Sequence, residues 1–184
     1  MKKIISIFIA LSVLLSGCAR ESTQQARSVC ESYMEKMHLG EYEDARGYVD
    51  PSLWTETMDL NALAEQAGYN EEVKKMFVSY MNYVVSKQWV TYKIKDATMK
   101  QGTATILAEV TGISAEDLLA LDTQAIVDTL NEKIQNGEST EGAFKTYFEA
   151  CQKQVDTLDK HTRIMEFQVS EKNGQWLITG MNVK

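Results

Sequence analysis

The sequence predicts an α+β domain, with N-terminal helices packed on a curved antiparallel sheet of about four strands and a helical pair inserted between two hairpins. Three observations support this prediction. Apolar residues recur at helical spacing between residues 26 and 84. Two later segments alternate apolar and polar residues around a glycine turn, as hairpins do, and a long amphipathic stretch lies between them. Helices followed by hairpins with one apolar face are typical of an α+β fold.

Residues 1–17 have the three-part layout of an export signal. Lys2 and Lys3 precede an apolar run over residues 4–15, and small residues follow the run. The run is too short for a permanent membrane span, which needs about 20 residues. We therefore expect residues 1–17 to be removed and to take no part in the fold.

The end of this signal, Leu15-Ser16-Gly17-Cys18, resembles the lipobox of bacterial lipoproteins. The resemblance implies cleavage after Gly17 and attachment of a diacylglyceryl group to the thiol of Cys18. The alternative is an ordinary cleavage site beside a chance cysteine. Each buried methylene of an acyl chain contributes about 0.8 kcal/mol, so the lipid would supply the membrane affinity. Residues 18–24 are then a lipidated cysteine and a short tether. The expected location is extracytoplasmic, at the cell surface or the periplasmic face of a bacterial membrane.

The mature chain is acidic. Removal of 17 of the 184 residues takes away two lysines and no acid, so the net charge changes from −7 to −9. This charge argues against nucleic acid as a partner, because nucleic-acid binding depends on neutralising phosphates. It also argues against adhesion to anionic lipid through basic patches. The remaining length suits one domain, which we assign to residues 25–184.

The N-terminal helices are predicted from apolar stripes and capping residues. Gly40 is suited to the C-cap of the first helix, and Asp50-Pro51 opens a turn after the second. Gly68 ends the third helix, and the side chain of Asn70 can cap the fourth. The predicted helices cover residues 21–37, 42–49, 58–67 and 70–87.

Two hairpins are predicted where the period of the apolar residues changes to two. The first has Val90, Tyr92 and Ile94 on one face and reverses at Gln101-Gly102. The second reverses at Asn173-Gly174, and Asn-Gly is the preferred pair for a type I′ turn.

A helical stretch over residues 114–160 separates the hairpins. Ser114 and Asp117 have the spacing of a capping box, and Asn136-Gly137 divides the stretch into two helices. Both helices are amphipathic, with Leu118 and Leu119 among the apolar residues of the first. Each helix must bury one face against the sheet, against the other helix or against a partner.

Two segments resemble a known superfamily. In residues 32–45 an amphipathic helix runs into a Gly-Glu-Tyr-Glu-Asp-Ala corner, and residues 172–178 form the closing hairpin. The chain resembles the nuclear transport factor two-like superfamily of cone-shaped, cystatin-like α+β domains, and in particular small bacterial lipoproteins of unknown function. The resemblance implies a sheet curved around the first helix. The inserted helices depart from the family pattern. They would close the pocket if they packed over the open end of the cone, and would offer a docking surface if they projected.

Catalysis in that superfamily uses an acid or an acid–histidine pair inside the cone. Here His38 and His161 lie near predicted helix ends, where a histidine more often complements the helix dipole. The strand acids Asp96, Glu109 and Glu166 alternate onto the face opposite the apolar one. The sequence contains no glycine-rich phosphate loop, GxSxG or HExxH motif. We expect no enzyme, no cofactor and no metal; an acid/base site inside the cone is the alternative.

Aromatic residues are the candidate ligand-binding residues. Tyr33, Tyr48, Trp89 and Tyr92, together with Trp176, could line a pocket for an apolar ligand, or could be core.

Cys30 and Cys151 both lie on apolar stripes of predicted helices. They are either two buried thiols or one disulfide, which an extracytoplasmic location allows.

Together these features predict a membrane-anchored, non-catalytic binding or interaction module for a protein partner or a small apolar ligand. A solute-binding lipoprotein is a weaker alternative, because those proteins are usually two-lobed and longer.

Overall fold

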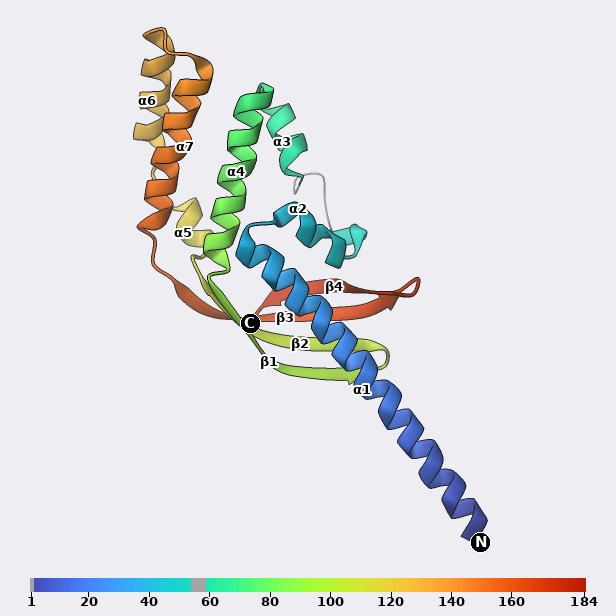
Figure 1. Ribbon diagram of the computed structural model, residues 1–184. Coiled ribbons are helices and arrows are strands. Elements are labelled where there is room, and N and C mark those ends of the chain that lie inside the picture. Colours follow the sequence, from blue (N-terminus) through green and yellow to red (C-terminus); the bar gives the residue numbers. More distant parts are fainter. Residues whose placement is uncertain (1, 54–58) are drawn as a thin grey trace.

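The computed structural model describes the backbone of residues 2–53 and 59–184, and the side chains of residues 21–53 and 59–184. The protein has an α+β fold, as the sequence predicts. Four antiparallel strands form one open sheet in the order β1-β2-β3-β4, and helix α1 crosses one face of it (Figure 1). The strands are β1 (Thr91–Lys100), β2 (Thr103–Gly112), β3 (His161–Lys172) and β4 (Gln175–Val183).

Helices precede the sheet and also interrupt it. The first group is α1 (Lys2–Leu39), α2 (Tyr42–Ala45), two 3₁₀ turns (Arg46–Tyr48 and Pro51–Leu53), α3 (Leu60–Gln66) and α4 (Glu71–Gln88). The group between β2 and β3 is α5 (Ala115–Leu119), α6 (Gln124–Gln135) and α7 (Thr140–Asp156). Among the described residues, no helix is long and apolar enough to span a membrane.

Helix α1 is amphipathic and ends where the sequence predicts. Its buried side chains, Ala26, Cys30, Tyr33, Met34 and Met37, recur at helical spacing and face the sheet. Gly40 has φ +72°, and the amides of Gly40 and Glu41 donate to carbonyls of the last turn, which is a Schellman end. Residues 21–24, part of the predicted tether, belong to this helix.

The sheet has one apolar and one polar face, because side chains alternate along each strand. The inner face carries the main core, in which Ile106 pairs with Phe167 across β2 and β3. The outer face is polar: Thr103 bonds Ser170 at 3.0 Å, and Thr105 bonds Gln168 at 3.2 Å. Alternation therefore predicts the inner face correctly, although Val90 and Tyr92, at the start of the first hairpin, are only partly buried.

Both hairpin turns are confirmed. Gln101 and Gly102 have φ values of 51° and 81°, and Asn173 and Gly174 have 54° and 82°. Positive φ at both central residues is the signature of a type I′ turn. Bulges interrupt the pairing between Ile94 and Asp96 and between Gln168 and Val169, and such bulges increase twist and bending.

The inserted segment contains three helices rather than the predicted pair. Ser114 accepts a hydrogen bond from the Asp117 amide, as predicted, but α5 is only five residues long. The predicted first helix breaks over residues 120–123, where Asp122 accepts from the Gln124 amide. Leu119, expected on the apolar stripe, is 88% exposed, because α5 ends there.

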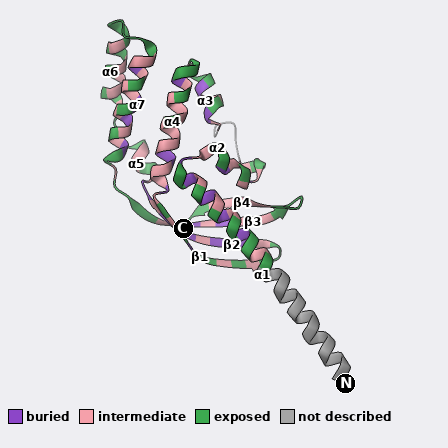
Figure 2. Cartoon of the chain, in the orientation of Figure 1, coloured by how far each residue is buried: buried purple, intermediate pink, exposed green. Residues whose placement is uncertain are grey.

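The helices α4, α7 and α6 form a single layer, which we call the arm. The arm stands away from the sheet, so the insertion projects and does not cover the sheet (Figure 1). Aromatic rings fill the contact between α4 and α7; Tyr80 stacks on Phe148 with the ring centroids 5.5 Å apart. Helix α6 contributes no buried residue, and Figure 2 shows exposed and intermediate positions along it.

Candidate functional site

The predicted aromatic pocket is filled by its own side chains. Tyr33 and Trp89 are only 4% and 5% exposed, and their rings meet edge to face at 5.8 Å. Tyr33 also contacts Phe167 at 5.9 Å, so these rings form core. Tyr48 and Tyr92 lie half-buried at the margin of the same cluster. The prediction that Tyr33 and Trp89 line an open pocket is therefore wrong.

The cysteines Cys30 and Cys151 are both free and buried. Cys30 faces the sheet from α1, whereas Cys151 lies on α7 in the arm, so the alternative of a disulfide between them is wrong. Burial raises the pKa of the Cys30 thiol to about 12 and also raises the pKa of Cys151. Both thiols therefore stay protonated and pack as small apolar groups. The side chain of Cys18 lies outside the described residues.

The two histidines join the ends of elements. Nδ1 of His38 donates to the carbonyl oxygen of Trp89 at 2.8 Å, which ties the end of α1 to the start of the sheet. Nε2 of His161 lies 3.1 Å from the Asp117 carboxylate. Both histidines are exposed.

The strand acids lie on the outer face of the sheet, as predicted. Glu109 pairs with Lys95 at 3.2 Å, and Glu166 pairs with Lys184 at 2.8 Å. Asp96 is exposed beside the bulge in β1. These carboxylates therefore point away from the apolar core between α1 and the sheet.

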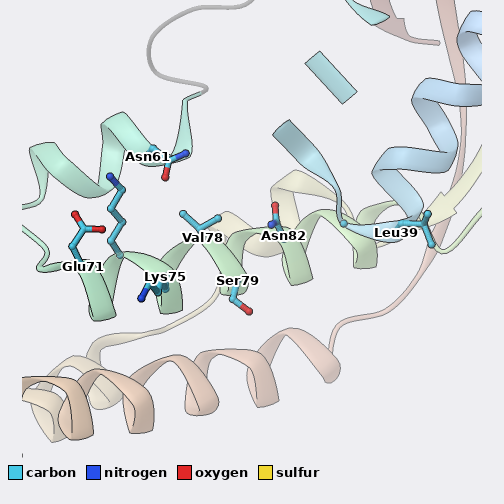
Figure 3. Close-up of a pocket in the computed structure, with 9 residues that line it drawn as sticks. Leu39, Asn61, Glu71, Lys75, Val78, Ser79 and Asn82 are labelled. Atoms are coloured by element: carbon cyan, nitrogen blue, oxygen red, sulfur yellow. The ribbon is translucent and has the colours of Figure 1, made fainter. Parts of the chain in front are cut away.

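A cavity of about 600 Å³ lies between the end of α1, helix α3 and helix α4 (Figure 3). We call it the α4 groove. One wall is a face of α4, the other is α3, and the end of α1 closes one end. Of the described residues, those that line it are Leu39, Gly40, Asn61, Glu71, Lys74, Lys75, Val78, Ser79 and Asn82.

The wall formed by α4 follows directly from helical spacing. Glu71, Lys75, Val78 and Asn82 are separated by four, three and four residues, so they share one face. At 1.5 Å per residue this face is about 16 Å long. Figure 3 shows Glu71 toward one end, Asn82 and Leu39 toward the other, and Asn61 on the opposite wall.

A cap fixes the start of each wall, and one ion pair joins the two walls. Asp59 caps α3 by accepting from the amides of Asn61 and Ala62, and the Ala62 amide is the main reason why the pKa of Asp59 is lowered. Asn70 caps α4 by accepting from the Val73 amide at 3.0 Å, as predicted. Lys74 of α4 reaches Glu65 of α3 at 2.6 Å, and this bond raises the pKa of Lys74.

The polar groups of the groove are unevenly matched. Lys74 and Lys75 pair with Glu65 and Glu72, which lie outside the lining, the latter pair at 2.7 Å. Glu71 influences both lysines electrostatically but forms no ion pair with any described residue. Oδ1 of Asn82 is buried and has no hydrogen-bond partner among the described residues.

The side chains of Glu71, Asn61 and Ser79 form no hydrogen bond or ion pair with a described residue, so the groove offers several polar groups to a ligand. Oδ1 of Asn82 is not one of these groups, because it has almost no accessible surface and a ligand in the groove does not reach it. The lining offers binding groups of both charges and two aliphatic contacts. Among the described residues, no cluster of three or more His, Cys, Asp or Glu residues could hold a metal ion.

Two smaller hollows lie on the arm. One, of about 220 Å³, has an apolar lining between α6 and α7 that includes Ile126, Leu130 and Tyr147. Another, of about 290 Å³, lies between α4 and α7 beside Met76 and Phe148. Each has less than half the volume of the α4 groove.

Sequence reasoning missed the α4 groove. Its residues come from α1, α3 and the face of α4 opposite the predicted apolar stripe, where polar positions normally indicate solvent. The one residue in the sequence that could have indicated the groove is Asn82, because asparagine has a weak helix propensity and Asn82 lies inside the 18-residue helix α4.

Comparisons of the chain with protein-family models, with curated proteins and with solved structures give no match.

Proposed function

We propose that the protein is an extracytoplasmic lipoprotein, held on a membrane through lipid on Cys18, whose domain binds a ligand in the α4 groove without catalysing a reaction. The observation that carries the binding function is the groove itself. It has the volume of a ligand site, and its lining combines charged and polar groups with aliphatic surface. The lipobox-like Leu15-Ser16-Gly17-Cys18 supports the location.

The resemblance to the nuclear transport factor two-like superfamily stays part of this proposal. A helix lying across one face of a bulged, four-stranded antiparallel sheet supports it. The mixed lining of the groove suits a polar ligand with an apolar portion better than the purely apolar ligand that the aromatic residues suggested.

Lipid attachment is tested by growth with a labelled fatty acid. Label should enter the wild-type protein and be absent from Cys18→Ser, which lacks the acceptor thiol. Equal label in both proteins would overturn the anchor.

Binding is tested by nuclear magnetic resonance on the mature chain in detergent micelles. Three mixtures serve as probes: pentapeptides, neutral oligosaccharides and fatty acids. At least one mixture should shift the amide signals of Asn61, Val78 and Asn82 together. If none of the three mixtures shifts them, the α4 groove is not a binding site.

A further inference from the structure

The arm is a single layer of helices, and α6 lies at its outer edge. Helix α6 packs on α7, and α7 separates it from α4 (Figure 1). Amphipathic helices normally bury their apolar faces between two packed layers. Helix α6 is amphipathic, yet it contains no buried residue. The arm therefore leaves apolar surface of α6 and α7 available to a partner.

The hollow of about 220 Å³ between α6 and α7 shows where a partner would bind. We call it the arm hollow. Ile126, Leu130 and Tyr147 give it apolar walls. The distance between packed helices depends on the side chains at their contact, and small ones allow close approach. Much of the lining is small: Ala125, Thr129, Ala143, Thr146 and Ala150.

The arm hollow has the dimensions of a helix contact. Its lining on α6 extends from Ala125 to Lys133, which is about 12 Å at 1.5 Å per residue. On α7 it extends from Ala143 to Ala150, or about 10 Å. Two turns of an α-helix have about this length. The apolar face of a short amphipathic helix would therefore cover the hollow.

The α6 side of the arm hollow is negatively charged. Asp128 and Glu132 each follow a lining residue by three positions, so they flank the hollow. Both are exposed, and neither forms an ion pair with a described residue. Lys133, the one basic residue of α6, pairs with Glu138 at 2.7 Å and does not neutralise them.

The charge of the whole insertion narrows the choice of partner. Residues 113–160 contain ten acidic residues and four lysines, so their net charge is −6. Two copies of the arm would repel each other, and an anionic lipid surface would repel the arm as well. On the α7 side, Glu149 and Lys153 give no net charge. The sign of the charge thus favours a basic partner, with its cations toward α6.

We propose that the arm hollow binds an amphipathic helix of a partner protein, with lysine or arginine residues along the edge that faces α6. Its apolar face fills the hollow, and its cations pair with Asp128 and Glu132. This protein-binding surface is separate from the ligand site in the α4 groove and does not depend on it.

The test uses three synthetic peptides of about 14 residues, long enough to cover the hollow. The first has leucines at helical spacing beside lysines, the second has glutamates in place of the lysines, and the third is the first in scrambled order. The protein is residues 18–184 with Cys18→Ser, so that no detergent competes for the peptides. The lysine peptide should bind at least roughly tenfold more tightly than either of the others.

Nuclear magnetic resonance locates the bound peptide. The lysine peptide should shift the amide signals of Ala125, Thr129 and Ala143. It should leave those of Asn61 and Val78, in the α4 groove, unchanged.

A large side chain at Thr129 tests the hollow itself. Thr129→Trp should abolish binding of the lysine peptide, because the indole ring occupies the hollow. Asn131→Trp is the matched control, since Asn131 is also exposed on α6 but lies outside the lining. It should bind like the unsubstituted protein. Thermal unfolding of each variant confirms that it is folded.

A pair of charge substitutions tests the α6 side. Asp128→Asn combined with Glu132→Gln should lower the affinity roughly three- to tenfold, because two exposed ion pairs are lost. Glu116→Gln combined with Asp159→Asn changes the net charge equally at exposed residues of the insertion that lie outside the hollow. This control should lower the affinity less.

Several results would overturn the proposal. They are no binding of the lysine peptide, equal binding of the glutamate peptide, and equal effects of Thr129→Trp and Asn131→Trp. Sedimentation of the free protein gives a further check. A dimer that Thr129→Trp dissociates would show that a second copy occupies the arm hollow in place of a basic partner.

Discussion

Two glycines with the same backbone conformation have different surroundings. Gly40 and Gly68 both have φ +72°, which an L side chain adopts only with strain. A Cβ at Gly40 would lie 2.5 Å from the backbone oxygen of Asn82, where α1 ends against α4. A Cβ at Gly68 meets nothing within 4 Å. Substitutions at these two glycines therefore separate the effect of backbone strain on stability from the effect of the close contact between α1 and α4.

We expect Gly68→Ala to lower the free energy of unfolding by about 1 kcal/mol, which is the strain alone. Gly40→Ala should lower it by more than about 3 kcal/mol, because α1 and α4 must also move apart. Urea unfolding of both variants measures the difference. Equal losses would mean that α1 and α4 separate without cost.

The buried thiol of Cys30 predicts a loss of stability in alkali. Burial raises its pKa from near 9 to about 12, so between these values the folded chain keeps a proton that the unfolded chain releases. Stability contributed by the neutral thiol is complete below pH 9 and is lost as the pH rises through 12. The free energy of unfolding should fall by up to about 1.4 kcal/mol for each pH unit in this window.

Urea unfolding at pH 9 to 10 tests this prediction before tyrosines dominate the titration. Cys30→Ala should show a shallower slope than the wild-type protein, by the equivalent of at most one proton. An unchanged slope would show that Cys30 ionises as easily in the folded protein as in the unfolded chain.

At the scale of elements, local patterns predict the sheet and most helix ends. The Asn173-Gly174 pair and the alternation around it specify a hairpin without any distant contact, and the Asn70 cap depends only on the next turn of helix. The break between α5 and α6 and the α4 groove could not be predicted. Both depend on how separate helices meet, and the polar face of α4 becomes a groove wall only when α1 and α3 lie beside it.

The inserted helices are separable from the main core. Among the described residues, the core between α1 and the sheet contains none from residues 113–160. Gly112 and His161 are direct register partners, so a two-residue Asn-Gly turn can replace residues 113–160. This deletion exposes the face of α4 that α7 contacts. The shortened chain should stay soluble if that face also carries the substitutions Phe77→Gln, Tyr80→Gln and Val84→Gln.

We expect this shortened chain to keep a cooperative unfolding transition and the near-ultraviolet circular dichroism of buried Trp89. The same deletion without the three substitutions should aggregate, because apolar side chains of α4 are then exposed. An unfolded chain in both cases would show that residues 113–160 are required for the fold.

At the scale of the whole molecule, α1 sets which end of the domain faces the proposed anchor. Thr23 and Arg27 of α1 line a hollow together with Lys95 of β1, so this part of α1 lies beside β1. At the C-terminal end of α1, His38 contacts Trp89, which follows the last residue of α4. The loop over residues 136–139, between α6 and α7, lies at the far end of the arm (Figure 1). A lipid on Cys18 would therefore place the hairpin turns near the membrane and direct the arm away from it.

Spin labels on Gln101→Cys and Asn136→Cys measure this orientation on vesicles. Cys30 and Cys151 are buried and should stay unlabelled. A lipid-soluble relaxing agent should shorten the relaxation time of the spin label at residue 101 more than that of the label at residue 136. The same labels on Cys18→Ser should show no such difference, and a reversed order would contradict the orientation.

The pairing of β2 with β3 also has a consequence for the order of folding. Within each hairpin only two residues separate the paired strands, whereas 48 residues separate Gly112 from His161. For a flexible chain, closing the longer loop costs roughly 3 kcal/mol more in entropy than closing the shorter one. The hairpins can therefore form early and independently, and the centre of the sheet, where the strands are most buried, assembles last. The rate of folding would depend on how quickly α4 and α7 meet, because their contact brings β2 and β3 together.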